Sequence, residues 1–130
     1  MALETGLSGE IEIVVTEKDT AAQWGSGLVP VYATPALVGL LESAAVKALE
    51  GHLEEGQTTV GGRIDVRHLA ATPVGMRVRA RAELMEVEGR RLAFRVQAWD
   101  EVEKIAEAHH DRFVVNKEKF GARAMEKGKL

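Results

Sequence analysis

The 130-residue chain contains no cysteine. This absence excludes disulfides, thiolate zinc sites, iron–sulfur clusters and thiol nucleophiles together. Aromatic residues are also scarce, with three Phe, two Trp and one Tyr. The hydrophobic core must therefore be built mostly from aliphatic side chains.

No charge sign dominates, because 17 Lys and Arg stand against 20 Asp and Glu for a net charge of −3. Such a balance gives no general attraction to nucleic acid or to an anionic membrane, so neither is expected as a partner. Arginines that alternate along the predicted strands, among them Arg77, Arg79 and Arg81, are expected to form ion pairs with Asp65 and Glu83.

Long hydrophobic runs are missing, since none approaches the roughly 18 residues that a membrane-spanning helix needs. The start of the chain, Met1-Ala2-Leu3-Glu4, lacks the charged and then apolar order of a signal peptide. We therefore expect a soluble, cytoplasmic protein. The length predicts a single domain over 1–130, with a core from about 10 to 116 and a basic tail over 117–130 that frays.

Hydrophobic periodicity first alternates and then becomes helical. Residues 10–16 alternate as in a half-buried strand, and residues 17–33 indicate a short helical turn followed by a glycine-loosened loop. A period of 3.6 predicts one long helix from Thr34 to about Leu53, with Thr34 as N-cap and Pro35 in the first position. Its apolar arc is broad, so the helix should be covered over most of its circumference.

After Gly56 the period becomes two and stays there. The pattern predicts four consecutive antiparallel strands, over 60–68, 76–84, 92–99 and 104–115. The predicted fold class is α+β, a five-stranded antiparallel sheet wrapped on one long central helix. One helix cannot cover both faces of such a sheet, so a homodimer is expected.

Three residues stand out from this pattern. Glu42 lies on an apolar flank of the predicted helix, where a carboxylate either reaches solvent at the stripe's edge or serves a function. His68 shares a face with Val60, Gly62, Ile64 and Val66; such a histidine is usually a core residue, but beside Glu42 it would form an acid–base unit. Thr34 is expected to cap the helix, and the N–H groups of this helix N-terminus could also stabilise a developing oxyanion; both roles can hold together.

Other motifs in the sequence give little evidence of a functional site. Ser26 is not in a G-x-S-x-G elbow, because Trp24 occupies the position of the first glycine. No Lys-Ser/Thr follows Gly61-Gly62, so these glycines indicate a strand bulge or a close backbone approach and not a phosphate loop. The run His109-His110-Asp111 alternates across a strand, and no metal site is expected there.

Two segments give the chain a family resemblance. The stretch Val31-Tyr32-Ala33-Thr34-Pro35-Ala36 with Leu41-Glu42, and the stretch from Thr58-Thr59-Val60-Gly61 to Val66-Arg67-His68-Leu69-Ala70-Ala71-Thr72-Pro73-Val74-Gly75, resemble hot-dog-fold acyl-CoA thioesterases. The similarity is strongest to the fluoroacetyl-CoA thioesterase family and covers roughly residues 10–116.

The resemblance implies specific site residues. Thr34, Glu42 and His68 match the Thr, Glu and His that act together in that family. Gly61 matches the position where a backbone N–H approaches the acyl group, and Arg112 matches a recurrent basic position. The family's aromatic lid is not matched, because the loop Gly25 to Val31 offers Leu28 with other aliphatic residues as the substrate-contacting cover.

The expected function is therefore hydrolysis of a short- or medium-chain acyl-CoA to the free acid and CoA. No metal and no cofactor are expected, since CoA is part of the substrate. Two alternatives stay open at this point: a non-catalytic acyl-CoA or acyl-carrier binding module, and an acyl-thioester hydratase or dehydratase of the same fold.

Overall fold

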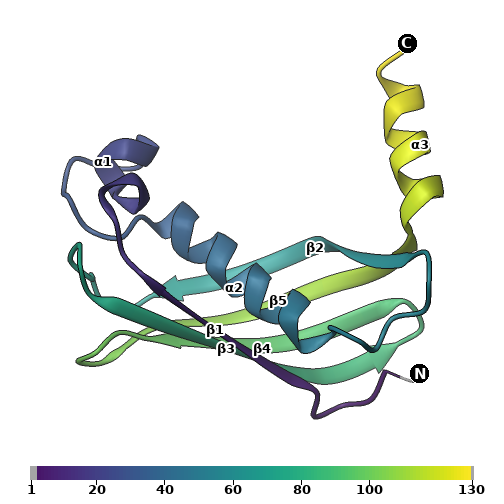
Figure 1. Ribbon diagram of the computed structural model, residues 1–130, viewed down its shortest axis with the longest axis horizontal. Coiled ribbons are helices and arrows are strands. Elements are labelled where there is room, and N and C mark those ends of the chain that lie inside the picture. Colours follow the sequence, from purple (N-terminus) through teal and green to yellow (C-terminus); the bar gives the residue numbers. More distant parts are fainter. Residues whose placement is uncertain (1–2, 130) are drawn as a thin grey trace.

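The computed structural model describes residues 3–129. These residues form the strands β1 (Ser8–Val14), β2 (Gln57–His68), β3 (Arg77–Glu88), β4 (Arg91–Trp99) and β5 (Lys104–Asn116), the 3-10 turn η1 (Glu17–Asp19), and the helices α1 (Ala21–Trp24), α2 (Thr34–Ala48) and α3 (Lys117–Lys127). Figure 1 shows α2 lying across one face of a curved sheet. Among these residues, no helix is long and apolar enough to cross a membrane.

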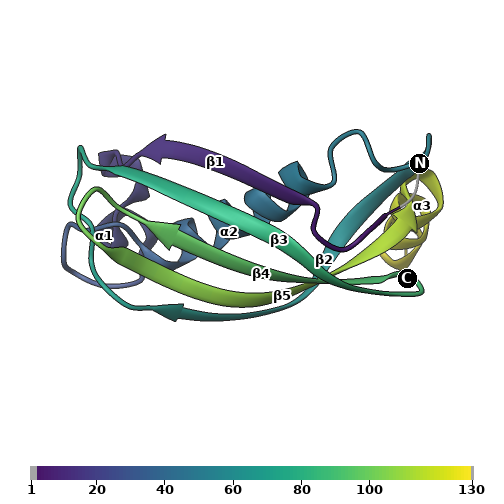
Figure 2. The same ribbon diagram turned by 90° about the horizontal axis from the view of Figure 1, so that it is seen from below.

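The sheet has the strand order β1-β3-β4-β5-β2, and each neighbouring pair is antiparallel. Figure 2 shows the face of the sheet that points away from α2. The predicted α+β fold with a five-stranded antiparallel sheet is confirmed. Because β2 pairs only with β5, this strand of 12 residues leaves one long edge with unpaired backbone groups.

Alternation along the strands places small and aliphatic side chains on the inner face of the sheet, where α2 packs. Leu37, Leu41 and Ala44 of the helix are fully buried there. Close packing also depends on Gly9 of β1, because a Cβ at this position would lie 2.4 Å from the backbone nitrogen of Ala48. The helix and β1 can approach one another only because Gly9 has no side chain.

Two expectations about α2 are wrong. The helix ends at Ala48 and not near Leu53, because Gly51 turns the chain with φ 81°, a left-handed conformation that stops helices. The helix is also not covered over most of its circumference within this chain. The helix packs mainly against β1 and β3 and much less against β2, and the side of the helix that carries Val46 is open, with Val46 49% exposed.

The basic tail does not fray as expected. Residues Lys117–Lys127 form α3, whose N-cap Asn116 accepts a hydrogen bond from the backbone N–H of Lys119. Good helix-forming residues and this cap explain the difference. None of its residues is buried, and α3 stands away from the sheet on the side of α2 (Figure 1).

The outer face of the sheet carries paired charges. Arg81 lies 3.5 Å from Glu83, as expected, and Arg79 lies 2.6 Å from Glu10. The expected pairing with Asp65 is not found among residues 3–129. The additional acids come from β1, because β1 pairs with β3 and places Glu10 opposite the arginines.

Candidate active site

Thr34 and His68 meet where α2 begins and β2 ends. The hydroxyl of Thr34 lies 2.8 Å from Nδ1 of His68. The expected capping role of Thr34 is wrong: Ala33 is the N-cap, and Thr34 is the first residue of the helix, so its hydroxyl is free to reach the histidine.

The other ring nitrogen of His68 is unsatisfied. Nε2 is buried and has no hydrogen-bond partner among residues 3–129. Burial lowers the pKa of His68, and the nearby backbone of Ala70 opposes this effect in part. The imidazole is therefore neutral at pH 7, with Thr34 on one nitrogen and an open position on the other.

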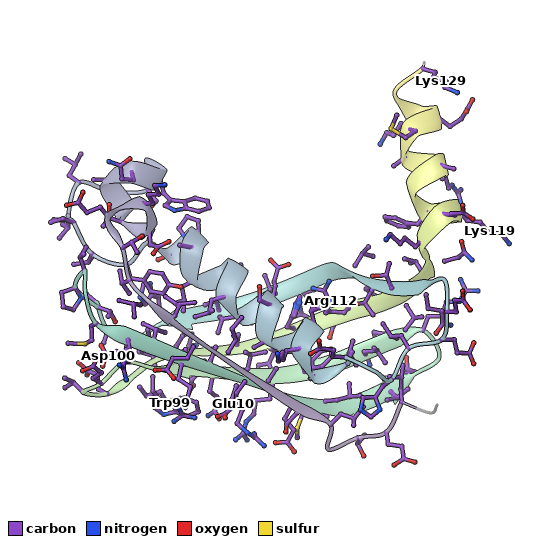
Figure 3. The ribbon with its side chains drawn as sticks, in the orientation of Figure 1. Glu10, Trp99, Asp100, Arg112, Lys119 and Lys129 are labelled. Atoms are coloured by element: carbon purple, nitrogen blue, oxygen red, sulfur yellow. The ribbon has the colours of Figure 1, made fainter. Side chains whose placement is uncertain are left out.

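Glu42 belongs to a second cluster, beside Arg112 of β5. Nη1 of Arg112 lies 3.6 Å from Oε2 of Glu42, and the arginine side chain is 8% exposed against 41% for the glutamate. Arg112 also donates from Nε to the hydroxyl of Thr59 (2.9 Å) and from Nη2 to the Thr59 carbonyl (3.0 Å). In Figure 3, Arg112 is labelled beside β2 and β5, near the C-terminal half of α2. Burial lowers the pKa of Arg112 and Glu42 raises it, yet a guanidinium stays charged at neutral pH.

His110 completes this cluster, and sequence reasoning missed it. Its Nδ1 lies 2.7 Å from the Arg63 carbonyl, and its Nε2 lies 3.1 Å from Nη1 of Arg112. The sequence holds one signal that could have found it: strand alternation puts His110 and Arg112 on the same inward face as Ala106 and Ala108. Two polar side chains on an otherwise apolar face are candidates for a shared role.

The glycine pair of β2 brings backbone close to Glu42. The register between β2 and β5 shifts between Gly61 and Arg63, so the expected bulge is confirmed. A Cβ on Gly61 would lie 3.4 Å from Oε2 of Glu42, whereas a Cβ on Gly62 would lie 2.2 Å from the ring of Phe113. Placing Gly62 and Val60 on the face of His68 is therefore wrong. The bulge turns Gly62 outward, and the register before it puts Val60 opposite the outward-facing Phe113.

The two clusters do not meet within one chain. Thr34 and Glu42 are separated by eight helical residues, a rise of about 12 Å. Gly61 and His68 lie roughly 20 Å apart along β2. Among the described residues, the polar partners of Glu42 and of His68 are different groups, so an acid–base pair of these two is not formed in this chain alone.

The remaining predicted contact residue, Leu28, lies between α1 and α2 and is 96% exposed. It therefore contacts neither cluster substantially within this chain. Within residues 3–129, no group of three His, Asp or Glu side chains is arranged to hold a metal ion.

Comparison with known proteins identifies the family to which a chain with this architecture belongs. A family model described as fluoroacetyl-CoA-specific thioesterase matches residues 15–118. The fluoroacetyl-CoA thioesterase of Streptantibioticus cattleyicolor is 47% identical over 97 residues, which cover 75% of this chain and 70% of that protein.

Solved structures agree with these matches. A structure of the fluoroacetyl-CoA thioesterase FlK superposes with a TM-score of 0.92 at 38% identity and covers 98% of both chains. A thioesterase superfamily member from Thermus thermophilus gives a TM-score of 0.91 at 32% identity, covering 98% of this chain and 95% of the other.

The fold and the similar solved structures define the class of the protein: it has the hot-dog fold and belongs to the thioesterase superfamily. More closely, the chain belongs to the fluoroacetyl-CoA-specific thioesterase family. The resemblance inferred from the sequence is confirmed, as is the expectation of a thioesterase enzyme.

Proposed function

We propose that the protein hydrolyses a short- or medium-chain acyl-CoA to the carboxylic acid and free CoA. Family membership supports the reaction class, and a mutant of the related FlK enzyme has been solved with fluoroacetate and CoA. The observation that carries the proposal is the pairing of Glu42 with the buried Arg112 beside the backbone of Gly61. This brings the Glu42 carboxylate beside the bulged backbone of β2, and thioester hydrolysis needs both a base or nucleophile and groups that polarise the carbonyl.

Glu42 has the central role in this reaction. Nη1 of Arg112 lies 3.6 Å from Oε2 of Glu42, and the carboxylate oxygens can act as a base or as a nucleophile. As general base, Glu42 takes a proton from water while the water oxygen attacks the thioester carbon. As nucleophile, its oxygen attacks the thioester carbon, the C–S bond breaks and CoA thiolate leaves, and water then opens the resulting anhydride. After a single turnover in H₂¹⁸O, ¹⁸O in Glu42 identifies the anhydride route, because the general-base route does not exchange the carboxylate oxygens.

Thr34 and His68 serve the other side of the thioester. With the Thr34 hydroxyl donating to Nδ1, the ring proton of His68 lies on Nε2, the nitrogen without a partner among residues 3–129. In our proposal this N–H hydrogen-bonds to the reacting group and exchanges protons with the Glu42 carboxylate. The overall step breaks the C–S bond, and the proton that Glu42 takes from water returns to the thiolate as CoA-SH.

The complete site forms between two copies of the chain. In antiparallel pairing of β2 with the same strand of a second copy, the first half of each strand lies beside the second half of the other. The cluster at Gly61 then faces the partner's cluster at His68, which resolves their separation within one chain. The unpaired edge of β2 and the exposed Val46 on α2 support this homodimer.

Mixing two inactive variants tests the shared site directly. Glu42→Gln and His68→Asn each remove one half. A mixed dimer contains one intact site, so random mixing should restore about a quarter of wild-type activity. No restoration after verified subunit exchange would contradict the shared site. Light scattering that gives a mass near the 14.1 kDa of one chain at micromolar concentration would contradict the dimer itself.

A panel of acyl-CoA thioesters of two to eight carbons, with fluoroacetyl-CoA, tests the reaction. Release of free thiol with formation of the acid supports hydrolysis. A changed double bond without thiol release supports a hydratase or dehydratase instead. Tight binding with neither change supports a binding module and overturns the proposed function.

A further inference from the structure

The side chain of His110 is buried in the Glu42 cluster and uses both ring nitrogens. It is 2% exposed, and it lies on β5 two residues before Arg112. The Arg63 carbonyl can only accept a hydrogen bond, so Nδ1 must carry the ring proton (2.7 Å). Nε2 must then accept from Nη1 of Arg112 (3.1 Å). These two contacts specify one neutral tautomer.

Each contact of His110 stabilises a different part of the site. The Arg63 carbonyl lies at the bulge of β2, where the register shift leaves backbone groups without their usual strand partners. The bond from Nδ1 satisfies that carbonyl next to Gly61. The bond at Nε2 occupies the Nη1 of Arg112 that also faces Glu42, while Thr59 occupies Nε and Nη2. The guanidinium is thus held from three directions.

We propose that His110 is a positioning residue that fixes the Arg112 guanidinium and, through it, the orientation of the Glu42 carboxylate. The inference rests on the proposed function, in which Glu42 acts on the thioester. His110 itself does not contact the reacting atoms, because neither of its nitrogens is free.

The charges around His110 favour its neutral form. Burial has the largest effect and opposes protonation, as does Arg112 on the same strand. The hydrogen bond with the Arg63 carbonyl, Glu42 on α2 and Asp111 on β5 favour protonation, and the net effect is a lowered pKa of His110. A proton on Nε2 would remove the acceptor of Arg112 and set two cations 3.1 Å apart. A neutral histidine can therefore accept a hydrogen bond from Arg112, whereas a second positively charged residue would repel the guanidinium.

Two substitutions separate the two bonds. His110→Asn places an amide near the position of Nδ1 and keeps a donor for Arg63, but it is too short to accept from Arg112. His110→Gln reaches the position of Nε2 and retains that acceptor. His109→Asn is the matched control, because His109 is the neighbouring exposed residue on the outer face.

We expect His110→Asn to lower kcat about 10-fold with little change in KM, the effect of one hydrogen bond to a charged group. His110→Gln should restore kcat to within about threefold, and His109→Asn should match wild type. In an Arg112→Met background, His110→Asn should change kcat by less than about twofold, because the histidine acts through the arginine. A folded His110→Asn variant with wild-type kcat, or an undiminished loss in that background, overturns the proposal.

A measurement without substrate keeps this test separate from the proposed function. Long-range ¹H–¹⁵N spectra of the wild-type protein should show His110 as the neutral Nδ1–H tautomer between pH 7 and 8, above the ordinary histidine pKa of about 6.5. His110→Gln should retain the Nε–H resonance of Arg112, and His110→Asn should shift it. If the spectra show these features but no acyl-CoA is hydrolysed, the proposed function is wrong, while the contact between His110 and Arg112 is supported. If His110 shows the Nε2–H tautomer, the positioning contact itself is wrong.

Discussion

The two polar clusters on the inner face are built in opposite ways. Thr34 and His68 share one hydrogen bond at an exposed end of the sheet, and the remaining ring nitrogen has no partner among residues 3–129. Arg112 and His110 are buried, and they satisfy one another together with Thr59 and the Arg63 carbonyl. The Glu42 side chain of that second cluster is 41% exposed.

In the proposed shared site, we call the Thr34–His68 pair the open half-site, because one ring nitrogen has no partner among residues 3–129. The Glu42 cluster is the supported half-site, because hydrogen bonds hold Arg112 and His110 in place. A buried network with all its hydrogen bonds made is rigid, and removing one member leaves the others unpaired in a poorly hydrated place. An exposed pair can lose a member cheaply, because water replaces it. We therefore expect the Glu42 cluster to govern both stability and activity, and the Thr34–His68 pair to govern activity alone.

The largest expected effect comes from Glu42→Gln. This isosteric change removes the base or nucleophile and should lower kcat at least about 100-fold, the lower range of general-base contributions. The control is Glu50→Gln, which alters an exposed glutamate near the end of the same helix that pairs with Lys47 at the surface. Steady-state kinetics with confirmation of folding by circular dichroism measure the effect. Turnover near wild type in a folded Glu42→Gln variant would remove Glu42 from the mechanism.

Thr34→Val tests the open half-site. It removes the hydroxyl from Nδ1 of His68, and kcat should fall about 10-fold, the effect of one hydrogen bond. Thr34→Ser retains the hydroxyl and should stay close to wild type. The unfolding free energy of both variants should remain within about 1 kcal/mol of wild type, since the site is exposed. A larger loss of stability on urea titration would show that this pair is structural after all.

Arg112→Met should destabilise the fold where Thr34→Val does not. It leaves the Thr59 carbonyl and Nε2 of His110 without their donor, so the free energy of unfolding should fall by about 2 kcal/mol. Arg77→Met on the outer face is the matched control, because its partner Glu12 is exposed and such a pair contributes less than about 1 kcal/mol. Equal losses for the two variants would contradict the contrast between the clusters.

We expect the substrate range to depend on the loop that precedes α2, close in the chain to Thr34. Leu28 and Val29 are exposed aliphatic residues and not an aromatic lid. Each methylene accepted or refused by an apolar pocket changes the free energy by only about 1–3 kcal/mol. Propionyl- and butyryl-CoA should therefore be hydrolysed with kcat/KM at least equal to that for acetyl- and fluoroacetyl-CoA. A preference for fluoroacetyl-CoA over acetyl-CoA above roughly 100-fold would contradict this prediction.

The smallest expected effect is on stability against pH. The pKa values of His68 and His110 are both lowered by burial, so the unfolded chain binds their protons more readily than the folded one. The contribution of these two histidines to the free energy of unfolding should be fully present above about pH 6.5. It should be lost progressively as the pH decreases below that value. Urea titrations between pH 5 and 8 measure this slope. His110→Gln should reduce the slope, and an unchanged slope would mean that His110 does not contribute.

Local sequence signals account for most of the fold. The change from a period of 3.6 to a period of two predicted α2 and the strands, because burial of one helix stripe or one strand face depends on neighbouring residues in the chain. The same signals failed at Thr34, at the end of α2 and in the tail. Those boundaries depend on cap geometry, which a pattern of apolar residues does not record.

The sequence by itself determined the α+β class, the aliphatic core and the candidates Thr34, Glu42 and His68. Only the tertiary structure decided their partners. Glu42 meets Arg112, 70 positions later, because β2 pairs with β5 and not with its neighbour β3. Gly61 rather than Gly62 faces the carboxylate because a bulge shifts the register. These contacts arise from strand order and register, which are set by packing of the whole sheet and not by any local run of residues.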